Sequence, residues 1–474
     1  MKEAKTETSK NRPPIVVVLG HVDHGKTTLL DAIRKTSVAS REAGGITQAI
    51  GASVVETKEG KKITFIDTPG HAAFTKMRGR GAQVADIAVL VVAQDDGPKP
   101  QTLEALQIIR DAKIPFVVAG TKADVTGANP ERLRGELEKE QIFFEGRGGD
   151  TPFISVSAKT GAGITELLEM ISLMADVAEL KSGPGADLEA VIIESGKDKM
   201  GVTATLVVRN GSIKVGDTVF AEKLECKVRA LFDSKGVSKR AVGPGEPAKI
   251  LGFSETPQVG ATVSREPHEV QKEVVKPKNP FDLRRLREDE IPVIIKASNA
   301  GALEAIVASL PQKIVVVGSG VGEVVASDIL DAKTGNAYVL SFESKVPNDI
   351  LKLAEAEKVK VKRFEIIYEL LQYLDELLKK GKVEVVGKAE ILASFPFNDK
   401  KVAGCKVVSG RISKGDRLIL ERDGKEVGTA KAISLRKQKS EVASVGQSEE
   451  FGVILAPQLD FKIGDVILSV GNGK

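Results

Sequence analysis

One stretch constrains the fold of this chain more than any other: Gly20-His21-Val22-Asp23-His24-Gly25-Lys26-Thr27. It follows the apolar run 15–19, which is typical of a strand, and precedes residues 28–33, which are typical of a helix. A glycine-rich turn in this context can point backbone N–H groups at a phosphate, and the positive end of the helix adds to the attraction. We expect Lys26 to reach the terminal phosphates of a nucleotide and the Thr27 hydroxyl to bind Mg²⁺. The alternative is an ordinary glycine turn.

Length and composition place the chain among multidomain globular proteins. A chain of 474 residues is too long for one hydrophobic core and suggests about three or four domains. Its 42% hydrophobic and 28% charged residues are typical of a soluble fold. No apolar run approaches the ~20 residues of a membrane span, and residues 1–12 lack the apolar centre of a signal peptide. A cytoplasmic location is therefore expected.

Cysteine, charge and aromatic content narrow the classes of function. The two cysteines, Cys226 and Cys405, cannot form a disulfide framework or a cysteine metal cluster, which fits a reducing compartment. The net charge of +4 permits contact with nucleic acid but does not require it. With no Trp and three Tyr, the chain has few aromatic platforms for stacking unpaired bases.

Residues 14–181 are expected to form a nucleotide-binding domain after a disordered tail at 1–13. Apolar β-runs alternate here with helical stretches, and the last predicted helix covers 166–180. The alternation predicts a mostly parallel sheet with helices on both faces and ligands at the C-terminal ends of the strands. The predicted strands are 15–19, 63–67, 87–93, 115–120 and 153–156.

Two loops near these strand ends carry residues suited to a phosphate and a metal ion. The first is Asp67-Thr68-Pro69-Gly70-His71, in which Asp67 can hold Mg²⁺ and the Gly70 N–H can bind a γ-phosphate. The second is Gly44-Gly45-Ile46-Thr47, in which Thr47 can supply another hydroxyl to Mg²⁺. The alternatives are a simple Asp-Pro-Gly turn and an ordinary loop.

The next two strand ends favour guanine over adenine. In Thr121-Lys122-Ala123-Asp124, the carboxylate of Asp124 can accept hydrogen bonds from N1 and the 2-amino group of guanine, a pair of donors that adenine lacks. The stem of Lys122 can pack over the base. In Ser157-Ala158-Lys159, a backbone N–H can meet guanine O6. Each short pattern is common by chance, so the prediction of GTP rests on their order along the sheet.

The ordered set of motifs resembles the translational GTPases. The stretch Glu42-Ala43-Gly44-Gly45-Ile46-Thr47-Gln48, together with residues 85–93, 95–97 and 100–102, is similar to the bacterial translation initiation factor 2 family in particular. One position departs, because that family usually has Asn where this chain has Thr121. The resemblance extends from about residue 13 to residue 467.

The resemblance implies GTP and GDP as ligands, Mg²⁺ as the metal and His71 as the catalytic residue. His71 would position the attacking water when ribosomal RNA engages the domain, and a solvent-exposed turn histidine is the alternative. The metal would be held by Thr27, Thr47 and Asp67. The residues expected to bind GTP are Gly20, His21, Val22, Asp23, His24, Gly25, Lys26, Thr27, Thr28, Asp67, Thr68, Pro69, Gly70, Thr121, Lys122, Asp124, Ser157, Ala158 and Lys159.

Two β-barrels of one plan are predicted after the linker 181–185. The pattern Val208-x-x-Gly211-x-Ile213-x-x-Gly216-Asp217 returns as Val407-x-x-Gly410-x-Ile412-x-x-Gly415-Asp416. Asn-Gly at 210–211 is a strong hairpin signal, and both regions are rich in strand and turn residues. We therefore predict barrels at 187–265 and 386–474.

The second barrel resembles the domain of that family which binds the formylmethionyl end of initiator tRNA. A formylated amino end is uncharged, so a partly apolar pocket can accept it and reject a free ammonium group. The resemblance implies a pocket with Cys405, with Phe451 where the family has a second cysteine, and with Arg436 near phosphates. A small buried hydrophobe is the alternative for Cys405, and a solvated charged face for Arg436.

The middle of the chain carries no catalytic pattern. Residues 266–290 are predicted as a linker and 291–362 as a small α/β/α domain. Residues 364–378 carry apolar side chains at helical spacing, so a helix is predicted within a connecting segment at 363–381. Such a stripe usually packs against a domain, whereas the family resemblance implies a spacer between the GTPase domain and the last barrel.

These inferences predict a multidomain α/β and β protein with a P-loop GTPase domain on a mostly parallel sheet, a β-barrel, a small α/β/α domain, a spacer helix and a C-terminal β-barrel. The resemblance implies a translation initiation factor that binds formylmethionyl initiator tRNA on the small ribosomal subunit, promotes joining of the large subunit and then hydrolyses GTP. Other initiation factors are further expected partners, with no membrane and a monomeric chain. The alternatives are an elongation-type GTPase that delivers another aminoacyl-tRNA and a nucleotide-binding scaffold that does not hydrolyse GTP.

Overall fold

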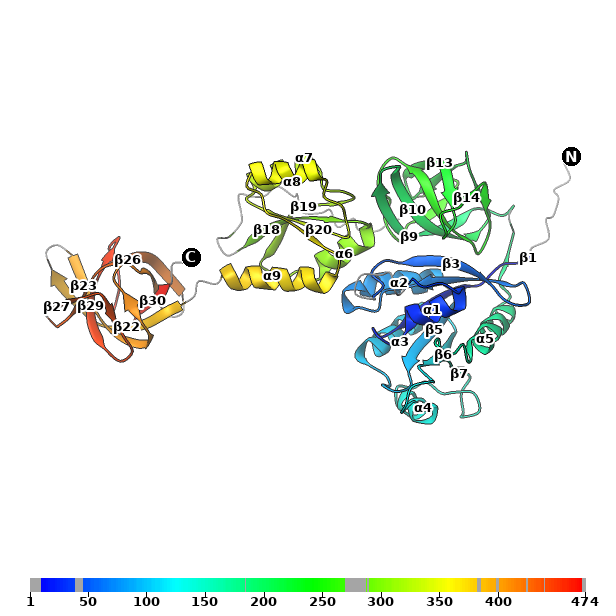
Figure 1. Cartoon of the computed structure of the whole chain (residues 1–474), viewed down its shortest axis with the longest axis horizontal. Helices are drawn as coiled ribbons and strands as arrows, with labels where there is room; N and C mark the ends of the chain where they lie inside the picture. Colours follow the sequence, from blue (N-terminus) through cyan, green and yellow to red (C-terminus); the bar gives the residue numbers. More distant parts are fainter. Residues whose placement is uncertain are drawn as a thin grey trace. The chain divides into compact units, whose positions relative to one another are not determined.

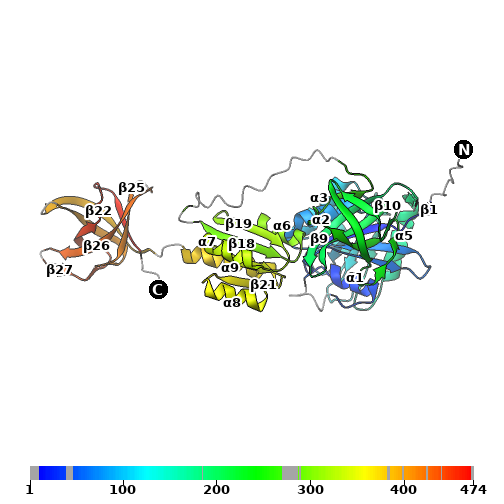
Figure 2. The same ribbon diagram turned by 90° about the horizontal axis from the view of Figure 1, so that it is seen from above.

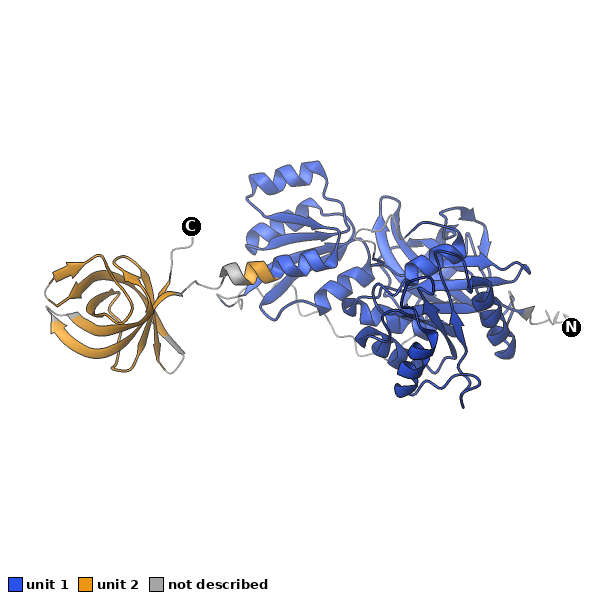
Figure 3. Cartoon of the chain, turned by 60° about the horizontal axis from the view of Figure 1, so that its bottom comes forward, with its two compact units in different colours: residues 1–374 blue, residues 375–474 orange. Residues whose placement is uncertain are grey.

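The chain folds as two compact units, residues 1–374 and 375–474, in a computed structural model (Figure 3). The predicted class, α/β combined with β-barrels, is confirmed. No helix within the part of the chain described is long and apolar enough to cross a bilayer. The structure describes residues 10–38, 46–183, 185–268, 287, 290–381, 385–397, 400–422, 425–438 and 440–470.

The first unit contains a six-stranded sheet in the order β3-β4-β2-β5-β6-β7 (Figure 1). All neighbours pair in parallel except the edge strand β3, which runs antiparallel to β4. The two central strands, β2 and β5, are buried along their whole length, because helices cover both faces. The strands are β2 (Ile15–Gly20), β3 (Gly51–Glu56), β4 (Lys62–Asp67), β5 (Ile87–Ala93), β6 (Phe116–Thr121) and β7 (Phe153–Ser155).

Helices cover this sheet as the alternating pattern predicts. The apolar faces of α1 and α5 pack with Val16 and Val18 on one side. On the other side, Gly81 of α2 lies against Val17, and α3 packs beside α2. The helices are α1 (Lys26–Arg34), the 3-10 helix η2 (Ala72–Phe74), α2 (Thr75–Val84), α3 (Pro100–Ala112), α4 (Pro130–Lys139) and α5 (Ile164–Val177).

The five strands predicted in this domain are confirmed, and each predicted end lies within one residue of the observed end. The edge strand β3 was not predicted. Only one residue of β3, Val55, is fully buried, so the strand lacks the apolar run that marked the others. It is held by the ladder to β4, in which Ala52 is opposite Ile66. The loop residues 39–45, which include the predicted Gly44 and Gly45, lie outside the described residues.

The prediction of a disordered tail at 1–13 is wrong for its last residues. Strand β1 (Lys10–Asn11) pairs antiparallel with β8 (Lys181–Ser182), so the predicted linker also begins as a strand. The Arg12 guanidinium makes two hydrogen bonds of 2.7 and 2.6 Å to the carboxylate of Asp86, and both side chains are nearly buried. A buried, bidentate ion pair fixes the backbone here. Residues 1–9 lie outside the described residues.

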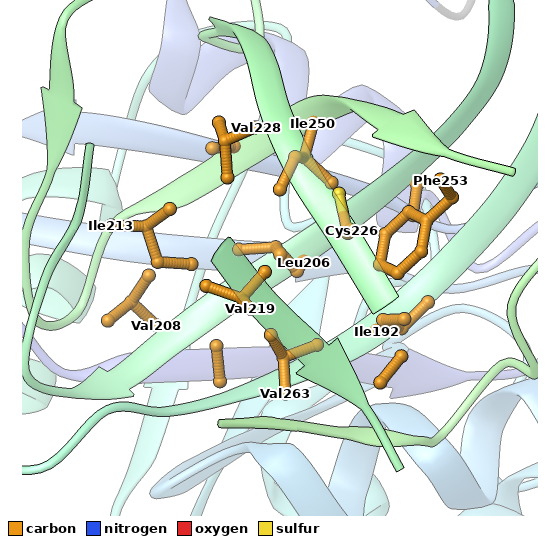
Figure 4. Packing of buried hydrophobic residues seen from close by; sticks show 14 of the residues in the cluster. Ile192, Leu206, Val208, Ile213, Val219, Cys226, Val228, Ile250, Phe253 and Val263 are labelled. Carbon is orange, nitrogen blue, oxygen red and sulfur yellow. The ribbon is translucent and has the colours of Figure 1, made fainter. Parts of the chain in front are cut away.

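A six-stranded barrel follows in the same unit, with the order β12-β17-β9-β10-β16-β13 and closure between β13 and β12. Its core is apolar, and residues such as Ile192, Leu206 and Ile250 point into the interior (Figure 4). The strands are β9 (Glu189–Asp198), β10 (Gly201–Asn210), β11 (Ile213–Lys214), β12 (Thr218–Ala221), β13 (Leu224–Phe232), β14 (Ser238–Lys239), β15 (Ala241–Val242), β16 (Pro247–Phe253) and β17 (Thr262–Ser264).

The second unit repeats this connectivity strand for strand, as the duplicated pattern predicts. Its order is β25-β30-β22-β23-β29-β26, closed between β26 and β25, with β24 paired to β28 as β11 is to β15. The strands are β22 (Val385–Phe397), β23 (Lys400–Gly410), β24 (Ile412–Ser413), β25 (Arg417–Arg422), β26 (Lys425–Lys437), β27 (Ser440–Val442), β28 (Ser444–Val445), β29 (Glu450–Ala456) and β30 (Val466–Val470).

The repeated glycines explain part of the shared pattern. Gly211 and Gly410 have φ angles of 71° and 72°, a conformation that favours glycine. A Cβ atom at Gly211 would lie 2.8 Å from the carbonyl oxygen of Ala186, and one at Gly410 would lie 2.1 Å from that of Val386. Each barrel therefore needs glycine at this turn for both backbone conformation and space.

The first unit also contains a four-stranded parallel sheet in the order β19-β18-β20-β21, which follows the first barrel in the sequence (Figures 1 and 2). In Figure 1, α7 and α8 lie on one face of this sheet and α6 and α9 on the other, which makes the predicted α/β/α layers. The elements are β18 (Ile291–Ala297), α6 (Ala300–Ala308), β19 (Ile314–Val321), α7 (Ala326–Thr334), β20 (Tyr338–Phe342), α8 (Asn348–Ala356), β21 (Val361–Phe364) and α9 (Ile367–Gly381).

The connecting helix begins later than predicted. Phe364, its predicted first residue, ends β21 and is opposite Phe342 in the parallel ladder. The helix begins at Ile367. Ile367, Leu370 and Leu374 are fully buried, so the apolar stripe packs against the α/β/α layers in its first two turns. A spacer role for the remainder of α9 stays a prediction.

Glu194 lies where three parts of the first unit meet. Its Oε1 accepts hydrogen bonds from the N–H groups of Ser195, at 2.9 Å, and of Gly301 at the start of α6, at 3.3 Å. Oε2 is buried and has no hydrogen-bond partner among the described residues. Burial raises the pKa of Glu194 to about 7, although these two bonds and the charge of Arg80 oppose the shift.

This pKa predicts a pH-dependent stability. Because the folded-state pKa lies above the ordinary value of 4.5, folded chains hold the proton longer than unfolded chains. The free energy of unfolding should therefore fall as the pH rises from about 5 to 7 and level off above that. In Glu194→Gln this slope should disappear, and the free energy of unfolding at pH 8 should increase by on the order of 2 to 3 kcal/mol.

Urea unfolding at pH 5, 6, 7 and 8 measures this effect. The control is Glu189→Gln, an exposed glutamate at the start of the same strand, which should keep the wild-type slope. If the free energy of unfolding of Glu194→Gln fell with pH as steeply as that of the wild type, ionisation of the Glu194 carboxyl would not be the cause of the decrease.

Candidate nucleotide-binding site

A pocket of about 370 Å³ lies at the C-terminal ends of the strands of the six-stranded sheet. It brings together fourteen of the residues predicted from the sequence. They are Val22, Asp23, Gly25, Lys26, Thr27, Thr28, Thr47, Gly70, His71, Thr121, Lys122, Asp124, Ala158 and Lys159. Seven others are not part of the lining: Gly20, His21, His24, Asp67, Thr68, Pro69 and Ser157.

The phosphate loop joins β2 to α1 through two left-handed residues, Asp23 and Gly25, with φ angles of 62° and 83°. Gly25 is the N-cap of α1, so the first N–H groups of the helix face the pocket. The ammonium group of Lys26 donates to the carbonyl oxygens of Gly20, at 3.0 Å, and His21, at 2.6 Å. Burial lowers the pKa of Lys26 to about 8, partly offset by the charge of Asp67. This ammonium group is placed to meet phosphate oxygens.

The two histidines of the loop, His21 and His24, pack against each other and do not line the pocket. His24 is 1% exposed, and its ring lies 4.9 Å from the ring of His21. Burial lowers the pKa of His24 to about 4, and His21 has the same direction of shift for the same cause, so both are neutral at pH 7. The two neutral rings therefore pack against each other within the loop.

Gln101 at the start of α3 was not assigned a role from the sequence. Its side-chain oxygen accepts the N–H of Val22 at 3.0 Å and so fixes the tip of the phosphate loop. The stretch Pro100-Gln101-Thr102 contributes to the family resemblance, but no local pattern shows which loop the side chain reaches.

Two hydroxyl groups meet where a metal ion is predicted. The Oγ1 atoms of Thr27 and Thr47 are 2.7 Å apart, although the two residues come from different segments. Asp67 ends β4 and is 3% exposed. Hydroxyl and carboxylate oxygens are the ligands that Mg²⁺ prefers, so the donor set fits this ion. The described residues contain no group of three or more His, Cys, Asp or Glu that could hold a metal, so phosphate oxygens and water would complete the coordination.

The turn after β4 is packed against the phosphate loop. A Cβ atom on Gly70 would lie 2.4 Å from Nζ of Lys26 and 3.1 Å from the backbone nitrogen of Val22. The fully buried guanidinium of Arg78 donates to the carbonyl oxygens of Pro69, at 3.0 Å, and His71, at 2.6 Å. It also makes an ion pair of 2.6 Å with Glu104 of α3. Arg78, which the sequence interpretation missed, thus holds the turn in one conformation.

His71 is half-buried rather than exposed. Its Nδ1 accepts the N–H of Ala73 at 2.9 Å and caps η2. Since Nδ1 accepts, the neutral imidazole carries its proton on Nε2. Burial and the nearby charge of Arg78 lower the pKa of His71. The ring also contacts Tyr368 of α9, with ring centroids 4.3 Å apart.

The base-recognition loops are connected to each other and to the phosphate loop. The Ser157 hydroxyl donates to Oδ1 of Asp124 at 2.6 Å, which orients the carboxylate and lowers its pKa. The Thr121 hydroxyl donates to the carbonyl oxygen of His24 at 2.6 Å. Thr121 departs from the family pattern, but its hydroxyl still joins the base-recognition loop to the phosphate loop through a buried hydrogen bond. An ionised, oriented Asp124 can accept two N–H groups from guanine.

A second pocket, of about 480 Å³, lies in the barrel of the second unit. It brings together the three residues predicted there, with Cys405 opposite Phe451 across β23 and β29 and Arg436 on the neighbouring β26. Burial raises the pKa of the Cys405 thiol to about 12, so it is neutral and acts as an apolar surface. The remaining lining residues are Leu392, Ala393, Phe395, Pro396, Val402, Gly404, Ser434, Gln438, Glu450, Gly452 and Ile454.

The close packing of Gly70 predicts a sensitivity to any added side chain. In Gly70→Ala, the new methyl group meets a backbone atom of the phosphate loop, so we expect the affinity for GTP to fall about tenfold or more. Titration with a fluorescent GTP analogue measures the dissociation constant. Gly79→Ala in α2 is the control, because no atom lies within 4 Å of its added Cβ. Equal affinities for the two variants would contradict the close-packing argument.

Three family models match the chain. The one described as "Elongation factor Tu GTP binding domain" matches residues 11–176, "Elongation factor G domain 2" matches 187–266, and "Translation-initiation factor 2" matches 266–375. The first match covers the nucleotide pocket except for Tyr368.

Curated relatives are similar over almost the whole chain. Translation initiation factor IF-2 of Caldanaerobacter subterraneus subsp. tengcongensis is 42% identical over 98% of this chain and 70% of that protein. IF-2 of Aquifex aeolicus is 41% identical over 96% of this chain and 60% of that protein. IF-2 of Thermus thermophilus is 39% identical over 98% of this chain and 88% of that protein. Among solved structures, GDP-bound aIF5B from Aeropyrum pernix is 28% identical, with a TM-score of 0.46, over 97% of this chain and 92% of that chain.

Proposed function

Because the chain belongs to the bacterial translation initiation factor IF-2 family of GTPases, we propose that it binds formylmethionyl initiator tRNA to the small ribosomal subunit and promotes subunit joining under control of GTP. The observation that carries the proposal is the convergence of three groups on one pocket. Lys26 faces the phosphate end, the hydroxyls of Thr27 and Thr47 meet beside it, and Asp124 is oriented at the base end. The chain spans 60 to 88% of the length of the three relatives named above.

GTP would lie with its phosphates on the loop between Gly20 and Lys26 and its base at Asp124. The helix N-terminus and the Lys26 ammonium attract phosphate charge, and the carboxylate accepts the guanine donors. Thr27, Thr47 and Asp67 would hold Mg²⁺. When bound there, the ion neutralises charge on the β- and γ-phosphates.

Gly70 and Thr47 would detect the γ-phosphate. A side chain at position 70 would press on Lys26 and Val22, so Gly70 lies close against the phosphate loop, and its N–H would bind a phosphate oxygen there. Loss of the γ-phosphate would remove this bond and release both loops.

His71 would position water rather than remove its proton. Its Nδ1 is occupied by the N–H of Ala73, so the neutral ring offers only the Nε2 proton. Such a group can donate a hydrogen bond to the attacking water or to the γ-phosphate, and positioning supplies much of the catalysis in phosphoryl transfer. Docking on ribosomal RNA would align the ring, which makes hydrolysis ribosome-dependent.

The pocket of the second unit would bind the formylmethionyl end of the tRNA. Its lining is largely apolar, and the thiol of Cys405 is neutral. A charged amino group against the apolar wall of Cys405 and Phe451 would lose its hydration, whereas a formylated one has no charge to desolvate. Both ribosomal subunits and other initiation factors are proposed as further partners. The elongation-type alternative is not favoured, because the IF-2 relatives are similar along 96 to 98% of the chain.

The role of His71 is tested by GTP turnover with and without ribosomes. His71→Ala should lose the stimulation by ribosomes while its affinity for GTP stays within about twofold of the wild type, because the ring does not hold the nucleotide. His268→Ala is the control, since this histidine does not line the pocket. Stimulation that persists in His71→Ala would refute the proposed role.

The tRNA pocket is tested by competition between formylated and unformylated initiator tRNA on the full chain. Leu392 lines the pocket and is 44% exposed. In Leu392→Asp, a new negative charge should lower the affinity for the formylated tRNA about tenfold or more. Val427→Asp is the control, because Val427 is similarly exposed, at 42%, on the same barrel but outside the pocket. Equal binding of both tRNAs to the wild type would refute the proposal for this barrel.

A further inference from the structure

Tyr368, in the first turn of α9, is part of the nucleotide pocket although it belongs to the segment predicted as a connection between domains. Its ring meets the ring of His71 edge to face, with centroids 4.3 Å apart and an angle of 85° between the planes. The side chain is 48% exposed, so one edge of the tyrosine remains open to the pocket. A residue of α9 thus contacts the side chain proposed to position water.

The same turn of α9 is attached to the loop that carries Thr47. The side-chain oxygen of Gln48 accepts the N–H of Ile367 at 3.1 Å, at the start of the helix. The side-chain nitrogen of Gln48 donates to the carbonyl oxygen of Glu365, at 2.7 Å, and to Glu343, at 2.9 Å. Gln48 is 4% exposed, so these bonds are protected from water. These hydrogen bonds of Gln48 fix the position of Tyr368 relative to the pocket.

His71 is held from several sides in this arrangement. Ala73 binds Nδ1, Arg78 binds the backbone carbonyl, and Tyr368 covers the ring. Ala73 lies in η2, directly after His71, and Arg78 lies in α2, the helix that follows. Tyr368 comes from a different part of the chain, so a movement of α9 can remove this contact from the imidazole and leave the hydrogen bond to Ala73 in place.

We propose that Tyr368 is a positioning residue that restrains His71, so that GTP hydrolysis without ribosomes stays slow until the first turn of α9 separates from the imidazole. The inference rests on the proposed role of His71 in hydrolysis. It assigns to α9 a direct effect on the chemical step, in addition to any role as a connection. An edge-to-face pair of this kind changes a conformational equilibrium by about two- to tenfold.

Single-turnover GTP hydrolysis without ribosomes tests the restraint. Tyr368→Ala should hydrolyse about two to ten times faster than the wild type at saturating GTP. Tyr368→Phe keeps the ring and should hydrolyse at the wild-type rate. Glu369→Ala, an exposed neighbour in the same turn that does not line the pocket, controls for general effects on the helix. The double variant His71→Ala/Tyr368→Ala should hydrolyse at the rate of His71→Ala alone.

A proton NMR titration supplies a readout that does not depend on hydrolysis. The chain has four histidines, so the ring signal of His71 is assigned by its loss in His71→Ala. Removing the tyrosine ring should shift this signal and raise the pKa of His71 toward 6.5, because burial lowers it in the folded chain. Glu369→Ala should leave both unchanged.

Three results would overturn the proposal. They are a wild-type or lower rate for Tyr368→Ala, a faster rate that persists in the double variant, and a His71 signal that is identical in Tyr368→Ala and the wild type. Failure of the proposed function is distinguishable, because it would appear in the wild-type chain as hydrolysis that ribosomes do not stimulate. The NMR result would still stand in that case.

Discussion

The close approach of Gly70 to the phosphate loop is the constraint on which the rest of the nucleotide site depends. Hydrogen at this position lets the turn after β4 approach Lys26 and Val22, whereas a side chain would displace the Lys26 ammonium group and press on the Val22 backbone. A turn this close must be held by groups that do not themselves enter the pocket. The buried guanidinium of Arg78 does this, with Glu104 of α3 as its partner, because a buried charge requires an opposite charge and hydrogen bonds. The sheet supplies the scaffold, and these polar contacts set the geometry of its loops.

A set of buried hydrogen bonds connects this pocket to segments that are distant in the sequence. Thr121 joins the base loop to the phosphate loop, and Gln48 joins the loop of Thr47 to the start of α9. Each of these bonds is shielded from water, so breaking one leaves a buried polar group without a partner. A change in the conformation of one loop therefore changes the hydrogen bonds available to the others. That coupling is what a nucleotide-dependent switch requires.

The two barrels share one backbone plan but differ in their side chains. Their strands pair in the same order and their turns share left-handed glycines, and the second barrel has a pocket with Cys405, Phe451 and Arg436 in its wall. The backbone plan depends on turn geometry and on an alternating apolar face. The pocket depends on side chains of β22, β23, β26 and β29, including the buried Cys405 and Phe451. Duplication of the plan therefore says little about the ligand, which the family relationship and the lining residues indicate.

The sequence by itself determined the elements whose signals are local. The phosphate loop, the apolar strands of the six-stranded sheet and the repeated glycine spacing of the barrels each carry a periodicity or a turn requirement that a short segment displays. Only the tertiary structure decided the rest: the edge strand β3, the ion pair of Arg12 with Asp86, and the positions of Gln48, Arg78 and Tyr368 around the pocket. Their contacts join residues far apart in the chain, and no local pattern encodes which distant group a buried polar or aromatic side chain will meet.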